Sequence, residues 1–223
     1  MTELQISFST FHITALVERF DGKAPNLWLH MDLKDIQPFI HGMADFQWNC
    51  VILAGHTWER DFSPWNTDLT LWGRSFSGGG REYLTRLTGE IMPAICEKCK
   101  LESNTHSIMG YSLAGLFSLF AAMESKCFSG AASVSGSLWY PNWHNYLLQA
   151  SHFPQKAYLS VGDKEKKSRN EAFRSIEDNT RFTYDIMRER GTNAIFELNS
   201  GGHFNQPMER MLRAAQWLTA QKE

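Results

Sequence analysis

The sequence lacks an excess of charge of either sign. It carries 22 Lys and Arg residues against 24 Asp and Glu residues, so its net charge is −2 over 223 residues. Nucleic acids and anionic membrane surfaces attract proteins through a strongly basic field, which a chain of this balance does not generate. We therefore expect neither a nucleic acid nor a membrane among its partners.

Long hydrophobic runs are also missing. The longest apolar stretch, around Leu113–Met123, is well short of the roughly 20 residues that a helix needs to cross a bilayer. The first residues, MTELQISFSTFHIT, lack the basic flank and the continuous apolar core of a signal peptide. The sequence therefore predicts a soluble, cytoplasmic protein.

Cysteines are few. The four cysteines are Cys50, Cys96, Cys99 and Cys127, of which Cys96 and Cys99 form a C-x-x-C. A zinc site would need two further ligands at matching spacing, and none follows. A redox motif would lie early in a βαβ unit, whereas this pair ends a predicted amphipathic helix. We expect reduced thiols in a reducing compartment, with no metal and no organic cofactor.

Internal repeats, low-complexity tracts and charge blocks are absent as well, so we expect one domain spanning residues 1–223. At 43% hydrophobic and 21% charged residues, the composition is that of a globular protein. Hydrophobic periodicity and turn residues indicate strands and helices along the whole chain. The predicted strands are Leu4–His12, Ala15–Phe20, Asn26–Met31, Asn49–Ala54, His106–Met109, Ser129–Val134, Tyr158–Val161 and Ala194–Leu198. The predicted helices are Ile36–Ala44, Glu82–Lys100 (with a kink at Pro93), Leu113–Met123, Glu171–Arg190 and Pro207–Lys222.

Strands that alternate with helices predict a mostly parallel sheet covered by helices on both faces. Ligands of such sheets bind beyond the carboxyl ends of the strands. The loops 110–112, 135–145, 162–170 and 199–206 should all open at that edge. Candidate chemical groups in these loops are therefore expected to converge.

The turn GYSLAG, residues 110–115, places a serine between very small residues. Ser112 follows a predicted strand and begins a predicted helix, and small neighbours leave room for a sharp turn that exposes its hydroxyl. The amide of Leu113 then lies at a helix N-terminus, where free N–H donors and positive potential suit an oxyanion. These features point to a serine nucleophile.

A serine hydroxyl needs a neighbouring base and a third group that orients the base. Among eight histidines, His203 has the strongest claim, because it follows Gly201-Gly202 between the last predicted strand and the last predicted helix. The loop after Tyr158–Val161 offers two carboxylates, Asp163 and Glu165. The order Ser…acid…His is that of an α/β-hydrolase.

Purely structural explanations exist for each of these groups. Ser112 is also a residue type that caps helices. Gly201-Gly202-His203 also fits an ordinary turn with a capping histidine. Asp163 and Glu165 are also typical of a solvated loop, and at least one of them is expected to be just that.

Several separate motifs resemble the putative-esterase family of α/β-hydrolases, and in particular its enterochelin esterase-like predicted hydrolases. The motifs are Gly110–Gly115 with Phe117–Phe120, Ser133–Trp139, Arg60–Pro64, Gly78–Gly80, Val161–Glu165 and Gly202-His203. The similarity runs from about Leu27 to the C-terminus. It implies an α/β-hydrolase fold, and because the chain itself lacks an obvious cap domain, we expect a shallow, open pocket.

Carried over to this sequence, the resemblance implies Ser112 as nucleophile, His203 as base and Leu113 N–H as an oxyanion donor. The family's acid falls three residues after the loop glycine, which matches Glu165, with Asp163 as the fallback. The second oxyanion amide should be that of Leu33, where relatives usually carry Asp-Gly and this chain has Asp32-Leu33.

Aromatic residues are expected to line the site, since the sequence has eight tryptophans. Trp58, Trp65, Trp139, Tyr140 and Trp143 are all predicted in loops, and Trp139 and Trp58, with Tyr111 beside the serine, are the candidates for contact with substrate.

The predicted function is a serine esterase that cleaves small carboxylic esters, or thioesters, through an acyl-enzyme. The alternatives are a non-catalytic binding module on the same scaffold and an acyltransferase or peptidase that uses the same residues.

Overall fold

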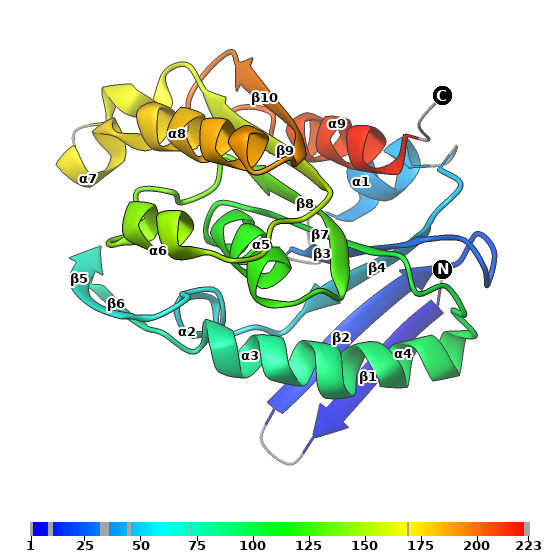
Figure 1. Cartoon of the computed structure of the whole chain (residues 1–223). Coiled ribbons are helices and arrows are strands. Elements are labelled where there is room, and N and C mark those ends of the chain that lie inside the picture. Colours follow the sequence, from blue (N-terminus) through cyan, green and yellow to red (C-terminus); the bar gives the residue numbers. More distant parts are fainter. Residues whose placement is uncertain are drawn as a thin grey trace.

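The computed structural model describes residues 2–8, 11–31, 36–43, 46–71, 73–168 and 170–220. In this part of the chain, eight strands form one sheet through the centre of the molecule, with helices on both faces (Figure 1). The strands lie side by side in the order β1-β2-β4-β3-β7-β8-β9-β10. Their bounds are β1 Thr2–Phe8, β2 Phe11–Glu18, β3 Asn26–His30, β4 Asn49–Ala54, β7 His106–Tyr111, β8 Phe128–Val134, β9 Lys156–Gly162 and β10 Asn193–Asn199.

The sheet is antiparallel at one end and parallel elsewhere. β1 and β2 form an antiparallel hairpin, and β2 pairs antiparallel with β4. From β4 to β10 every pairing is parallel. All residues of Asn26–His30 and Asn49–Ala54 are buried, as expected for strands that are covered on both faces. The predicted mostly parallel sheet with helices on both faces is confirmed.

Among the described residues, α1 and α9 lie on one face of the sheet, and α5 and α8 lie on the other (Figure 1). α1 and α9 pack together on a core that includes Leu27, Leu29 and Met109. On the opposite face, α5 packs on β7 and β8, and α8 packs on β9 and β10. The helix bounds are α1 Ile36–Gly42, α2 Trp58–Asp61, α3 Gly80–Arg86, α4 Met92–Cys99, α5 Leu113–Glu124, α6 Trp143–Gln149, α7 Glu171–Arg174, α8 Ile176–Glu189 and α9 Pro207–Thr219.

The helix α5 is the most deeply buried of these. Every residue from Leu113 to Met123 is buried. An all-round apolar helix is stable only when it is enclosed on all sides. This enclosure fixes the N-terminus of α5, and with it Ser112, against the end of β7.

Two predicted helices are interrupted. Instead of one helix over Glu82–Lys100, the chain forms α3, a π-helical turn at Leu87–Ile91, and α4. The π-turn precedes Pro93, whose missing N–H cannot join the α-helical hydrogen-bond pattern. The predicted helix Glu171–Arg190 is likewise two helices, α7 and α8, which are separated at Ser175.

Several short elements were not predicted. β5 (Asn66–Leu71) and β6 (Arg74–Ser77) form a separate hairpin. Trp58 and Trp143, predicted in loops, lie in α2 and α6. Segments of four to seven residues contain too little periodicity to be distinguished from loops by pattern alone.

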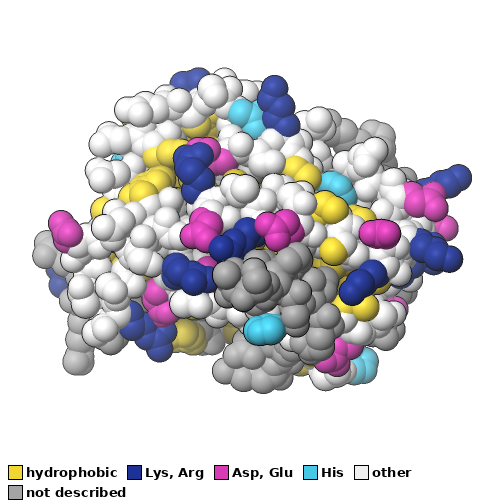
Figure 2. Space-filling model, turned by 90° about the horizontal axis from the view of Figure 1, so that it is seen from below, with side chains coloured by type: hydrophobic (Ala, Val, Ile, Leu, Met, Phe, Trp, Pro, Cys, Tyr) yellow, Lys and Arg dark blue, Asp and Glu magenta, His cyan; other side chains and the backbone are white. Residues whose placement is uncertain are grey.

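The surface carries charges of both signs side by side. Figure 2 shows Lys and Arg side chains interspersed with Asp and Glu side chains on the face seen from below the view of Figure 1. Arg81–Glu124 and Arg74–Glu59 are two of the ion pairs on the described surface. In the described residues, no helix is long and apolar enough to span a membrane.

Candidate active site

A sharp turn between β7 and α5 holds Ser112. Its backbone has φ 57° and ψ −122°, a region that residues with a side chain rarely adopt. A Cβ atom on Gly110 would lie 2.5 Å from the carbonyl oxygen of Ala114, and one on Gly115 would lie 3.0 Å from the carbonyl oxygen of Gly110. The small residues around the serine are therefore required by the close approach of strand and helix.

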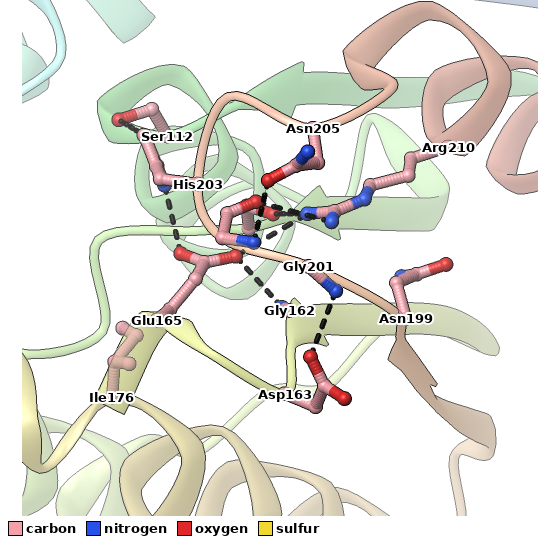
Figure 3. Close-up of polar contacts among 12 residues, drawn as sticks. Ser112, Gly162, Asp163, Glu165, Ile176, Asn199, Gly201, His203, Asn205 and Arg210 are labelled. Carbon is pink, nitrogen blue, oxygen red and sulfur yellow. Dashed lines mark hydrogen bonds and ion pairs between the residues drawn. The ribbon is translucent and has the colours of Figure 1, made fainter. Parts of the chain in front are cut away.

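The hydroxyl of Ser112 lies next to the imidazole of His203. The distance from His203 Nε2 to Ser112 Oγ is 3.1 Å, although the two residues are 91 positions apart (Figure 3). His203 comes from the loop between β10 and α9, beyond the carboxyl end of β10. The convergence of loops expected at this edge of the sheet thus joins these two side chains.

A carboxylate contacts the other nitrogen of the same imidazole. Glu165 begins a 3-10 turn after β9, and its Oε2 is 2.8 Å from His203 Nδ1 (Figure 3). Asp163 points elsewhere and accepts a hydrogen bond of 2.7 Å from the Gly201 amide through its Oδ1. Of the two carboxylates that the sequence offered, the structure brings Glu165 to the histidine and places Asp163 as a brace between the two loops.

The charge on Glu165 is stabilised although the side chain is buried. Burial by itself raises the pKa of this carboxyl, but hydrogen bonds from His203 and from the Gly162 amide outweigh it and hold the pKa below its ordinary value. The Gly162 amide donates to Oε1 at 2.7 Å, opposite the oxygen that faces His203. Only 5% of the Glu165 side chain is exposed, against 31% of the His203 side chain.

The N-terminus of α5 supplies an available amide beside the serine. Within the described residues, the Leu113 N–H donates to no acceptor, as is usual for the first amides of a helix. The Leu33 amide, the other predicted oxyanion donor, lies outside the described residues. Ser137 Oγ lies 3.5 Å from Ser112 Oγ and was not predicted to be near it.

A cavity of about 860 Å³ opens over these groups. Tyr111, Trp58 and Trp139 all line it, together with Phe173, which packs edge-on against Trp139 with ring centres 4.9 Å apart. The Tyr111 hydroxyl donates a hydrogen bond to the His203 carbonyl oxygen. Tyr111 therefore braces the histidine loop in addition to lining the cavity.

The remaining aromatic candidates have structural positions. Tyr140 and Trp143 are buried in the core, and Trp65 donates a hydrogen bond from its indole to the Pro141 carbonyl oxygen. Trp143 donates a hydrogen bond of 2.9 Å to the Thr183 hydroxyl. These three residues therefore stabilise the packing of the chain and do not line the cavity.

Two further histidines share one tyrosine, and one of them, His30, lines the cavity. Tyr83 Oη is 2.9 Å from His30 Nε2 and 2.7 Å from His56 Nε2, so its hydroxyl donates to one ring and accepts from the other. Burial lowers the pKa of His30 well below its ordinary value and that of His56 to about 3. His56 comes after β4, and its ring contacts Tyr83.

All four cysteines are free thiols, and Cys96 and Cys99 lie in α4. Burial raises the pKa of the Cys96 thiol to about 11. No cluster of three His, Cys, Asp or Glu side chains in the described part of the chain could hold a metal ion.

Arg210, on α9, was missed by the sequence analysis, although the sequence contained a signal for it. The buried side of α9 consists of Arg210, Met211, Ala214, Ala215 and Leu218. A charged residue within an otherwise apolar stripe needs buried partners, so its position already implied a polar network beneath the helix. Those partners are the loops that hold the acid and the histidine.

Comparison with known proteins gives one family and many similar folds. Residues 51–215 match the family described as "Putative esterase". A comparison with curated proteins found no match.

Among solved structures, the siderophore hydrolase EstA from Aspergillus nidulans is 18% identical with a TM-score of 0.76, and the match covers 98% of this chain and 93% of that one. An IroE-like serine hydrolase from Shewanella oneidensis is 14% identical with a TM-score of 0.78, covering 98% and 79%. The enterobactin hydrolase IroE in complex with DFP is 15% identical with a TM-score of 0.74, covering 99% and 95%. At these identities the similarity establishes the fold.

Proposed function

The chain belongs to the putative esterase family, and from that premise we propose that it hydrolyses small carboxylic esters through an acyl-enzyme formed on Ser112. The single observation that carries this proposal is the continuous contact from Ser112 Oγ through His203 to Glu165. A hydroxyl, an imidazole and a carboxylate in this order are the groups that activate a serine for acyl transfer.

In the proposed first step, Ser112 Oγ attacks the ester carbonyl carbon while His203 Nε2 accepts the hydroxyl proton. Glu165 accepts a hydrogen bond from the Nδ1–H of the imidazole, which selects the tautomer with a free Nε2 lone pair and stabilises the cation that forms. The Leu113 N–H donates to the developing oxyanion. The tetrahedral intermediate expels the alcohol, which takes the proton from His203.

In the second step, His203 Nε2 accepts a proton from water as the water oxygen attacks the acyl carbonyl carbon. The second tetrahedral intermediate expels Ser112 Oγ, which recovers its proton from His203, and the carboxylic acid leaves. In both steps His203 accepts a proton and then returns it, so the reaction needs no external cofactor.

The cavity walls favour substrates with an apolar or aromatic portion. Trp58, Trp139 and Phe173 line the cavity beside the serine, and flat aromatic faces stack with aromatic groups of a ligand. Two of the similar structures are a siderophore hydrolase and an enterobactin hydrolase, so a siderophore ester belongs in the substrate panel with short aliphatic esters, aromatic esters and thioesters.

A fluorophosphonate probe tests the proposal directly, because it forms a covalent bond with an activated serine. We expect one adduct, mapped by mass spectrometry to Ser112, and turnover of p-nitrophenyl esters that disappears in Ser112→Ala. Ser137→Ala is the matched control, since Ser137 is a second hydroxyl 3.5 Å away and should leave labelling intact. Labelling that persists in Ser112→Ala, or that maps to Ser137, would remove the assignment.

A further inference from the structure

Arg210 is a buried arginine whose side chain is 1% exposed, and it lies directly behind the acid of the candidate site. Its guanidinium donates four hydrogen bonds (Figure 3). The acceptors are Ser135 Oγ at 3.0 Å, Glu165 Oε1 at 3.3 Å, the Ser200 carbonyl oxygen at 3.1 Å and the Gly202 carbonyl oxygen at 3.1 Å.

These acceptors belong to three different loops. Ser135 follows β8, Glu165 follows β9, and Ser200 and Gly202 follow β10, immediately before His203. Because α9 is packed on the sheet, the arginine ties all three loops to one rigid helix. It therefore fixes the acid and the histidine relative to each other.

The Glu165 loop and the His203 loop lie so close together that there is no room for a larger residue than glycine at position 162. A Cβ atom on Gly162 would lie 2.3 Å from the Gly201 carbonyl oxygen and 3.2 Å from a terminal nitrogen of Arg210. Displacement of the guanidinium would shift both the Glu165 loop and the His203 loop. A displacement of about 1 Å in a catalytic group can lower the rate on the order of 10²-fold.

Arg210 and His203 contact opposite oxygens of the same carboxylate. Glu165 accepts a hydrogen bond from the arginine through Oε1 and contacts His203 through Oε2. The arginine therefore fixes the orientation of the carboxyl group that faces the imidazole.

We propose that Arg210 is a positioning residue that acts through Glu165: by tying the loops after β8, β9 and β10 to α9, it holds the carboxylate in line with His203. The inference rests on the proposed esterase function. It requires the fork of a guanidinium, because a lysine ammonium cannot reach acceptors on three loops at once.

The test compares Arg210→Met and Arg210→Lys with Arg213→Met on a p-nitrophenyl ester, with kcat and KM measured separately. Arg213 lies on the same helix and contacts Glu197 and Asn199 rather than Glu165, so Arg213→Met removes the same charge from α9 and should leave both constants unchanged. For Arg210→Met we expect kcat lower by about 10²-fold with KM nearly unchanged, because a displaced carboxylate impairs proton transfer and not substrate binding.

Arg210→Lys keeps the charge but loses the fork of the guanidinium, and should lose about tenfold in kcat. A wild-type kcat in Arg210→Lys, or a loss in Arg210→Met that appears in KM rather than in kcat, would overturn the proposal and leave Arg210 a structural residue. If Arg210→Met does not fold, the rate of Arg210→Lys alone decides. Absence of turnover in the wild type would instead refute the esterase function itself.

Discussion

The exchange of Glu165 for glutamine is the sharpest test of how the candidate site works. Glutamine has almost the same shape, but it replaces one acceptor oxygen with an NH2 donor. Oε1 receives hydrogen bonds from the Gly162 amide and from Arg210, so the glutamine oxygen must stay at that position. Its NH2 group then faces His203 Nδ1, where Oε2 lies 2.8 Å away in the wild type.

This orientation reverses the tautomer of the imidazole. An NH2 donor at Nδ1 requires Nδ1 to be an acceptor, which moves the ring hydrogen to Nε2, the nitrogen that lies 3.1 Å from Ser112 Oγ. The ring then has no lone pair for the serine proton. We expect kcat to fall by about 10³–10⁴-fold, equivalent to about 4–5.5 kcal/mol of transition-state stabilisation.

Asp163→Asn is the matched control. Its Oδ1 accepts the Gly201 N–H at 2.7 Å, and an asparagine oxygen can accept the same bond. We expect its kcat to stay within about threefold of the wild type, because the exchange leaves the contact in place.

The assay is kcat/KM for a p-nitrophenyl ester, with urea unfolding of each variant to exclude loss of fold. A Glu165→Gln enzyme within about tenfold of the wild type, or a larger loss in Asp163→Asn, would refute the tautomer argument and the choice of acid.

Three other predictions follow from burial and close contact. The pKa values of His30 and His56 are lowered in the folded chain. Below the ordinary histidine pKa of 6.5, both imidazoles therefore bind protons in the unfolded chain and stay neutral in the folded chain. The free energy of unfolding, measured by urea titration, should therefore be intact above that pH and fall below it, by up to about 1.4 kcal/mol per pH unit from His30 and by less from the partly accessible His56; a pH-independent value would contradict this. Gly110→Ala should destabilise the fold by about 2–3 kcal/mol in the same assay, because the contact 2.5 Å from its Cβ is a backbone oxygen that cannot move aside; a stable, active variant would argue against the close packing of β7 and α5. Trp139→Ala should raise KM for aromatic esters by about tenfold and leave kcat nearly unchanged, measured beside an aliphatic ester that should respond less; equal effects on both esters would exclude a stacking role for Trp139 and Phe173.

Much of the fold followed from local patterns in the sequence. Strands such as Asn49–Ala54 are short apolar runs, and their alternation with helices predicted the parallel sheet that the structure confirms. The interrupted helices were predicted as continuous. One extra residue in a single turn, as in the π-turn at Leu87–Ile91, changes the hydrophobic spacing too little to be recognised in the sequence. The short helices α2 and α6 were missed because so few residues define no period.

The candidate site was only partly predictable. Ser112 and His203 were named from turn chemistry and from their place in the element order, and the structure brings them within 3.1 Å. Their catalytic roles and that of Glu165 stay predictions. The residue pattern alone did not distinguish Asp163 from Glu165, since the two carboxylates lie two positions apart on one loop, and only the resemblance to the esterase family favoured Glu165.

What the sequence determined by itself is local: where the chain turns, which residues are small enough to turn there, and in which order the serine, the carboxylates and the histidine follow. The tertiary structure decided which carboxylate meets the imidazole, through the 3-10 turn at Glu165 and the close approach of Gly162 to Gly201. It also decided that Arg210 lies behind that carboxylate. The physical reason is that contacts between residues 38 to 91 positions apart depend on strand register and loop path, which only the packed sheet and helices define.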